Sequence, residues 1–209
     1  MPTRKGLFIT LEGIEGAGKS THLTFLKELI EAAGVALVTT REPGGTALGE
    51  KLRELLLHGA DNGMCSDAEL LLMFAARAEH IDKVIEPALA RSQWVLSDRF
   101  TDATYAYQGA GRGVAETRIA ALEQWVQGDL RPDLTLILDI APQEGLRRAA
   151  RRGTADRFER ETLEFFERVR AYYRALAQRA PQRIKLIDSG QTIEHIQQQL
   201  RSLLTAYLP

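Results

Sequence analysis

The sequence predicts an α/β fold in which helices cover both faces of a five-stranded parallel sheet. Short apolar segments alternate with stretches of helical periodicity, and no hairpin turn joins two of the apolar segments. The first apolar segment ends in a glycine-rich turn that leads directly into a helix. The 209 residues are enough for one well-buried domain and few for two, so we expect a single domain over residues 1–209.

Five segments fit strands, because each is a short run of mostly apolar, often branched residues. They are residues 7–12, 35–40, 94–99, 134–140 and 183–188. The helices expected between and after them are residues 19–33, 48–57, 66–87, 116–127, 143–152 and 193–207. In the first helix, leucines repeat at helical spacing and Gly34 follows as a stop signal. The third opens on Ser66-Asp-Ala-Glu69, which fits a capping box.

The glycine-rich turn fits the pattern Gly-x4-Gly-Lys-Ser/Thr. Its residues are Gly13, Ile14, Glu15, Gly16, Ala17, Gly18, Lys19, Ser20 and Thr21. With a strand before it and a helix after it, such a turn directs consecutive backbone N–H groups into one concavity at the positive end of the helix dipole, where polyphosphate binds. We expect Lys19 to reach the β- and γ-phosphates and Ser20 to offer its hydroxyl to Mg²⁺. A chance match is the alternative, and the flanking strand and helix argue against it.

Composition excludes several classes of protein. Lys and Arg number 27 and Asp and Glu number 28, so a formal net charge of −1 provides no overall basic field for nucleic acid. The single cysteine, Cys65, cannot form an internal disulfide or a cysteine-based metal site, which fits a reducing compartment. Glu12 interrupts the apolar run near the N-terminus, and no stretch is long enough to span a membrane. We therefore expect a cytoplasmic protein without a nucleic-acid or membrane partner.

Several arginines are placed where a phosphate could bind. Asp98 and Arg99 end the third expected strand, at the carboxyl edge of the sheet where open α/β sheets bind ligands. Arg53 lies among leucines on the second helix. Arg77 follows apolar residues at helical spacing, so its stem extends to solvent or its guanidinium points into a cleft, and spacing alone favours solvent.

Residues 147–160 hold six arginines. Such a charge run is usually a solvated helix face. Beside a phosphate loop we favour a second interpretation, a short mobile lid whose arginines close over the transferring phosphoryl group and exclude water.

A phosphate loop occurs in switches, motors and small-molecule kinases, so it does not define a reaction. The Asn-Lys-x-Asp and Asp-x-x-Gly strings of regulatory GTPases do not occur here, and a nucleic-acid motor would need a longer chain. Arg53, Arg77 and Arg99 suit an acceptor that is itself a phosphate, which favours a nucleoside-monophosphate kinase. A related kinase acting on another monophosphate or on a deoxynucleoside, and a non-catalytic ATP-binding switch, are the alternatives.

Seven strings, each weak alone, occur in order along the chain. They are Glu-Gly-Ile-Glu-Gly-Ala-Gly-Lys-Ser-Thr (12–21), Thr-Arg-Glu-Pro-Gly-Gly-Thr (40–46), Phe-Ala-Ala-Arg (74–77), Ser-Asp-Arg-Phe (97–100), Tyr-Ala-Tyr-Gln-Gly-Ala-Gly-Arg-Gly (105–113), Arg-Pro-Asp-Leu-Thr (131–135) and Asp-Arg-Phe-Glu (156–159). Together they resemble the bacterial thymidylate kinases over essentially the whole chain. The resemblance implies ATP-dependent phosphorylation of dTMP to dTDP in dTTP biosynthesis by in-line transfer, a three-layer P-loop kinase fold with a lid at about 147–160, Mg²⁺ and a homodimer.

The resemblance also implies which residues bind dTMP. They are Glu15, Glu42, Pro43, Arg53, Phe74, Arg77, Arg99, Thr104, Tyr107 and Gln108. Arg53 and Arg99 would hold the phosphate. Arg77 would contact thymine O4, and Thr104 and Gln108 the N3 edge. Tyr107 would lie beneath the deoxyribose and disfavour a 2′-hydroxyl, and Glu15 would face the 3′-hydroxyl. The family often has an aromatic residue where this chain has Met73, so base stacking is assigned to the neighbouring Phe74.

For ATP, the resemblance implies residues 13–21 together with Arg148 and Arg152, and for Mg²⁺ it implies Ser20 and Asp98, partly through water. Lys19, Arg99, Arg152 and Glu15 would be the catalytic residues. The family divides by whether its catalytic arginine lies in the phosphate loop or in the lid. Because the loop here contains no arginine, the resemblance implies a lid arginine, and Arg152, just before Gly153, is the best match.

The acceptor phosphate has a second pKa of about 6, so it is already a dianionic nucleophile at neutral pH and no general base is required. The four histidines form no catalytic constellation in the sequence, and we expect each to be a surface or packing residue. They are His22, His58, His80 and His195.

Overall fold

The computed structural model describes residues 6–59, 63–152 and 157–209 and, of Arg152, the backbone alone. Five strands form one sheet in the order β2-β3-β1-β4-β5, and every neighbouring pair is parallel. The strands are β1 (Phe8–Glu12), β2 (Leu37–Arg41), β3 (Trp94–Asp98), β4 (Leu134–Asp139) and β5 (Ile184–Asp188). The predicted parallel α/β fold is therefore confirmed, with strand boundaries displaced by one or two residues.

The helices follow the strands in the alternating order that a parallel sheet requires. They are α1 (Lys19–Ala32), α2 (Ala47–His58), α3 (Ser66–His80), α4 (Glu86–Ala90), α5 (Thr101–Thr104), α6 (Glu116–Gln127), α7 (Pro142–Ala149), α8 (Leu163–Arg179) and α9 (Ile193–Thr205). Two segments with π-helical hydrogen bonding, η1 (Ile81–Ile85) and η2 (Tyr105–Gly111), continue α3 and α5, and a 3₁₀ turn, η3 (Ala150–Arg152), continues α7. No helix in the described ranges is long and apolar enough to cross a membrane.

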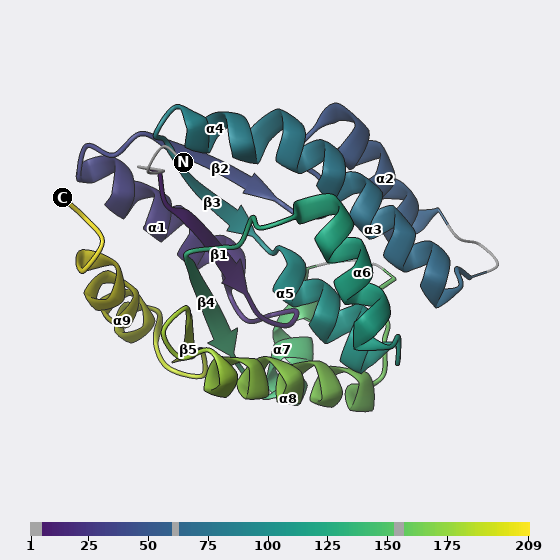
Figure 1. Cartoon of the computed structure of the whole chain (residues 1–209). Helices are drawn as coiled ribbons and strands as arrows, with labels where there is room; N and C mark the ends of the chain where they lie inside the picture. The colour runs from purple at the N-terminus through teal and green to yellow at the C-terminus, as the bar shows by residue number, and fades with distance from the viewer. Residues whose placement is uncertain (1–5, 60–62, 153–156) are drawn as a thin grey trace.

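Helices cover both faces of the sheet (Figure 1). α1 and α9 contact one another on one face, whereas α4 and α8 lie on the other. The central strand β1 is buried along its whole length, and its side chains alternate between the two sides. Ile9 and Leu11 belong to the same core cluster as Leu26 of α1, while Phe8 belongs to a second cluster with Leu89 of α4.

The register of the sheet brings the functional strand ends together. Asp98, the last residue of β3, is paired with Leu11 of β1 on one side and with Arg41 of β2 on the other. The chain leaves all three strands at this edge, so the turn after β1 and the loops after β2 and β3 start side by side.

The structure differs from the sequence prediction in several elements, including the helical segment formed by α5 and η2, which was not predicted. Residues 163–179 form the long helix α8, which the prediction did not include, although Phe166, Val169 and Tyr173 repeat at helical spacing and are buried. The expected capping box at the start of α3 does not form. Cys65 is the N-cap residue and makes no side-chain capping hydrogen bond. Glu69 is fully buried, and its carboxylate accepts a hydrogen bond from Gln108 instead.

Candidate active site

The turn between β1 and α1 has the backbone of a phosphate loop. Gly13, Gly16 and Gly18 have φ angles of +140°, +72° and +91°, a region that favours glycine. At Gly16 a second constraint adds to this, because a Cβ there would lie 1.9 Å from the backbone oxygen of Gly145 in α7. The loop therefore needs glycine both for its conformation and for its close contact with α7.

Lys19 is folded back over this loop. Its Nζ donates to the backbone oxygens of Gly13 at 2.9 Å and Ile14 at 3.1 Å. Burial, together with the nearby Arg99 guanidinium, lowers the pKa of Lys19 to about 8. The ammonium group is therefore held by neutral carbonyl groups in a desolvated position, where phosphate oxygens would be much stronger partners.

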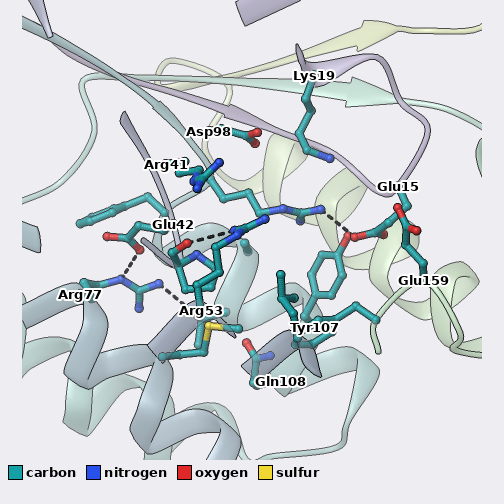
Figure 2. A pocket seen from close by; sticks show the side chains of 18 of the residues that line it. Glu15, Lys19, Arg41, Glu42, Arg53, Arg77, Asp98, Tyr107, Gln108 and Glu159 are labelled. Carbon is teal, nitrogen blue, oxygen red and sulfur yellow. Dashed lines mark hydrogen bonds and ion pairs between the residues drawn. The ribbon is translucent and has the colours of Figure 1, made fainter. Parts of the chain in front are cut away.

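A cavity of about 280 Å³ opens beside the loop (Figure 2). It brings together fourteen of the residues predicted for the site: Glu15, Gly16, Gly18, Lys19, Ser20, Glu42, Pro43, Arg53, Arg77, Asp98, Arg99, Thr104, Tyr107 and Gln108. Residues from five separate segments of the chain thus converge on one space. The predicted residues that do not line it are Gly13, Ile14, Ala17, Thr21, Phe74 and Arg148.

The cavity also has walls that the prediction did not include. They are Arg41, Leu57, Met73, Phe100, Ala103, Phe158 and Glu159. Arg41 is the last residue of β2, and its guanidinium donates to Glu50 at 2.7 Å. The sequence contained a signal for Arg41, because it follows a predicted strand and precedes Glu-Pro-Gly-Gly.

Glu15, Arg99 and Tyr107 form one group on the cavity wall (Figure 2). Arg99 Nη2 donates to one carboxylate oxygen of Glu15 at 2.9 Å, and the Tyr107 hydroxyl donates to the other at 2.7 Å. The Arg99 guanidinium also lies over the Tyr107 ring, 4.6 Å from its centroid. Burial raises the pKa of Tyr107 well above its usual value, so this hydroxyl remains a donor.

Arg77 is buried, with 2% of its surface exposed, so the expectation that it extends to solvent is wrong. Its Nε donates to Glu42 Oε2 at 2.8 Å, and its Nη2 donates to Thr104 Oγ1 at 2.9 Å (Figure 2). Spacing along α3 could not reveal this, because Glu42 lies in the loop after β2. The third nitrogen, Nη1, is buried and has no hydrogen-bond partner among the described residues.

The aromatic residue next to Arg77 does not lie where it was expected. Phe74 is buried outside the cavity lining, with its ring centroid 4.7 Å from the Arg77 guanidinium carbon. Met73 lines the cavity instead. The reason is the 100° rotation between successive helical residues, which turns Phe74 into the core when Met73 faces the cavity. Met73 rather than Phe74 therefore lines the cavity, and the assignment of base stacking to Phe74 stays a prediction.

Asp98 and Ser20 are suited to bind the expected Mg²⁺. Asp98 Oδ1 is buried and has no hydrogen-bond partner among the described residues, and Ser20 lines the same cavity. No group of three or more His, Cys, Asp or Glu that could hold a metal ion occurs in the part of the chain that the structure describes. One carboxylate and one hydroxyl suit Mg²⁺, which usually binds through few protein ligands and through substrate phosphates.

The described arginine side chains of residues 147–160 point in different directions. Arg147 is exposed and pairs with Glu144, and Arg148 donates to Glu144 and to the backbone oxygen of Ser189. Arg157 turns inward. It donates to the backbone oxygen of Leu56 and lies 2.7 Å from the buried Glu69. The side chain of Arg152 and residues 153–156, which include the predicted hinge Gly153, lie outside the described residues.

A phosphate loop after the first strand of a parallel sheet, with buried arginines across one cavity, defines a P-loop phosphotransferase that acts on a nucleotide. A thymidylate kinase family model matches residues 11–200, and the chain belongs to the thymidylate kinase family. This family phosphorylates dTMP to dTDP with ATP. The predicted family, fold and activity are thus confirmed.

Individual thymidylate kinases are similar to this chain over nearly its full length. A thymidylate kinase of Pseudomonas putida is 60% identical over 203 residues, which is 97% of each chain. One of Alkalilimnicola ehrlichii is 57% identical over 209 residues, covering 98% of this chain and 96% of the relative. The crystal structure of thymidylate kinase from Ehrlichia chaffeensis matches with a TM-score of 0.77 and 36% identity, over 96% of this chain and 98% of that one.

Proposed function

We propose that the whole chain acts as one catalytic domain, in which the cavity binds dTMP and the phosphate loop beside it binds ATP. Phosphoryl transfer then runs in line between the two. The observation that carries this proposal is the single cavity in which Lys19, Ser20 and Asp98 meet the buried Arg77. One end of the cavity offers cations and N–H groups to phosphate, and the other offers fixed polar groups to a base.

Arg53 and Arg99 hold the acceptor phosphate in this proposal. Arg53 is already fixed by a hydrogen bond to the Pro43 oxygen at 3.0 Å, and Arg99 by its pair with Glu15. The acceptor is a dianion at neutral pH, since its second pKa is about 6. The protein therefore has to align two polyanions and neutralise their repulsion, and it needs no general base.

Arg77 donates a hydrogen bond to thymine O4. Its Nη1 is a buried donor that lacks a partner within the described part of the chain, while its other two nitrogens are fixed by Glu42 and Thr104. Gln108 Nε2 donates to Glu69 at 2.7 Å, which leaves the amide oxygen to accept from the N3–H group of the base. Pro43 and Met73 complete the walls around the nucleoside.

Tyr107 and Glu15 recognise the deoxyribose. The Tyr107 ring is fixed by Arg99 and by its hydrogen bond to Glu15, so it cannot move away from a ribose 2′-hydroxyl. The Glu15 carboxylate remains the acceptor for the 3′-hydroxyl.

We assign Mg²⁺ to Ser20 and Asp98, supported by the Asp98 oxygen for which the described residues provide no hydrogen-bond partner. The ion would neutralise charge on the phosphates of ATP.

We assign to Arg152 of the lid the role of the arginine that stabilises the transition state. Arg152→Ala should lower kcat by about 10³-fold with little change in either KM. Arg147→Ala is the matched control, because Arg147 is exposed and pairs with Glu144. Equal kinetics for the two variants would contradict this placement.

We also propose a cytoplasmic homodimer. Large apolar side chains are exposed on helices that contact one another, namely Leu55 on α2, Leu71 on α3 and Trp125 on α6, the last with 83% of its surface exposed. Apolar surface of this kind marks interfaces. Light scattering of the wild type and of Leu71→Asp distinguishes a dimer from a monomer.

Arg77→Lys tests the proposed base recognition. Lysine keeps a charge near Glu42 but loses the planar fork that reaches Thr104 and the base together. We expect the KM for dTMP to rise about tenfold or more while the KM for ATP stays within about twofold. Arg118→Lys, at an exposed pair with Asp67, is the control. A coupled ADP-release assay gives both constants, and an unchanged KM for dTMP would mean that Arg77 is structural.

A further inference from the structure

His80, the last residue of α3, is fully buried against β2 and the loop that follows β2. Its Nδ1 lies 2.9 Å from Oε1 of Glu42, and its Nε2 lies 2.6 Å from Oγ1 of Thr40. A carboxylate can only accept, so Nδ1 carries a hydrogen, and in the neutral ring the Thr40 hydroxyl donates to Nε2. The ring therefore makes two directed hydrogen bonds, which is more than the packing role expected from the sequence.

Glu42 gives one carboxylate oxygen to each of two partners. Oε1 accepts from His80 and Oε2 accepts from Arg77 Nε at 2.8 Å. Arg77 in turn donates to Thr104 at 2.9 Å. A continuous chain of buried hydrogen bonds thus runs from Thr40 on β2 to Thr104 on α5, and the guanidinium that faces the cavity lies within it.

The surroundings leave His80 little freedom. A Cβ on Gly45 would lie 2.7 Å from His80 Nε2 and 2.6 Å from Thr40 Oγ1, so the loop after β2 is already packed against both groups. This close contact and the two hydrogen bonds of the ring together restrict the orientation of His80.

We propose that His80 is a positioning residue for base recognition, acting through Glu42 on the direction of the Arg77 guanidinium. The inference rests on the proposed role of Arg77 toward the base. With Oε1 held by His80, Glu42 offers Arg77 one oxygen and meets it only at Nε. Without His80, both carboxylate oxygens are available to Arg77, and a carboxylate prefers to pair with guanidinium through two parallel hydrogen bonds. The guanidinium would then turn toward Glu42 and away from the base.

Two substitutions of His80 separate this role from packing. An asparagine amide nitrogen takes the place of Nδ1 and keeps the hydrogen bond to Glu42. A glutamine amide nitrogen takes the place of Nε2 and keeps only the contact with Thr40. We expect His80→Gln to raise the KM for dTMP about tenfold, with kcat and the KM for ATP within about twofold. His80→Asn, although smaller, should raise it by less than about threefold.

A double-mutant cycle with Glu42→Gln gives a second measurement that does not depend on the asparagine variant. If His80 acts through Glu42, then His80→Gln should raise the KM for dTMP no further in the Glu42→Gln background. Each variant is first checked for native secondary structure by circular dichroism, and dTMP binding is also measured by calorimetry.

The outcomes distinguish the inference from the function on which it rests. Equal losses in His80→Asn and His80→Gln, a fall in kcat alone, or independent effects of His80→Gln and Glu42→Gln would each overturn the positioning role. If Arg77→Lys raises the KM for dTMP while His80→Gln does not, the inference alone fails. If Arg77→Lys leaves that KM unchanged, the proposed base recognition fails as well.

Discussion

Glu12 should make the stability of the protein depend on pH. It is the last residue of β1 and is fully buried. One carboxylate oxygen accepts from the Phe100 backbone N–H at 2.8 Å, and the other accepts from the Tyr173 hydroxyl at 2.7 Å. Burial, together with the neighbouring Asp102 carboxylate, raises the pKa of Glu12 from 4.5 to about 8.

The raised pKa of Glu12 determines whether stability rises or falls with pH. The folded pKa lies above the unfolded one, so the folded state binds the proton more tightly. The stabilisation is fully present below pH 4.5 and is lost as pH rises toward the folded pKa of about 8. At about 1.4 kcal/mol per pH unit, the loss over this window totals about 5 kcal/mol.

Glu12→Gln is the perturbation that isolates this effect. Glutamine keeps the size and stays neutral, its carbonyl can accept from Phe100, and its amide can donate to the Tyr173 oxygen. We expect the free energy of unfolding of the wild type, relative to the variant, to fall by about 3 kcal/mol or more between about pH 5 and about pH 8. Urea unfolding at several pH values measures it. Parallel stability curves for the two proteins would refute a raised pKa at Glu12.

Two further outcomes follow from the phosphate loop. Because burial lowers the pKa of Lys19 to about 8, ATP phosphates should restore its charge, so binding near pH 8 should take up a proton. Calorimetry in buffers of different ionisation enthalpy should detect this uptake, and its persistence in Lys19→Met would contradict the assignment. Gly16→Ala should destabilise the protein by about 2 kcal/mol or more, because the new Cβ meets the Gly145 oxygen at a residue with positive φ. Gly113→Ala, where φ is also positive but nothing lies nearby, should cost less in thermal unfolding, and equal costs would show that the contact is unimportant.

The phosphate loop could be predicted from the sequence because its conformation is set locally. Three glycines with positive φ, a strand before and a helix after define its conformation, and the contact of Gly16 with α7 is an additional constraint that the sequence does not reveal. The parallel sheet was predictable for a similar reason, since alternation of strands and helices restricts the topology to few choices.

Hydrogen bonds and ion pairs between residues distant in sequence could not be predicted in this way. Helical spacing alone favoured a solvent-facing Arg77, because its counter-charge, Glu42, is 35 positions away. Glu69 fits a capping box in sequence but turns to Gln108, which is 39 positions away. His80 has no visible partner in sequence either, since Thr40 comes close only when β2 joins the sheet. In each case the prediction considered only the residues near the polar side chain in sequence. In the structure, a segment distant in sequence packs against that side chain and buries it.

The hydrogen bond between Glu12 and Tyr173 also bears on the order in which the protein is made. β1 is the first strand to be synthesised, yet its two sheet neighbours are β3 and β4, and Tyr173 lies 161 positions further along the chain. Contacts so distant in sequence form slowly and late. A nascent chain that ends before α8 leaves Glu12, at the base of the phosphate loop, without one of its two donors. We therefore expect the base of the phosphate loop to gain its full set of contacts only after α8 has been synthesised.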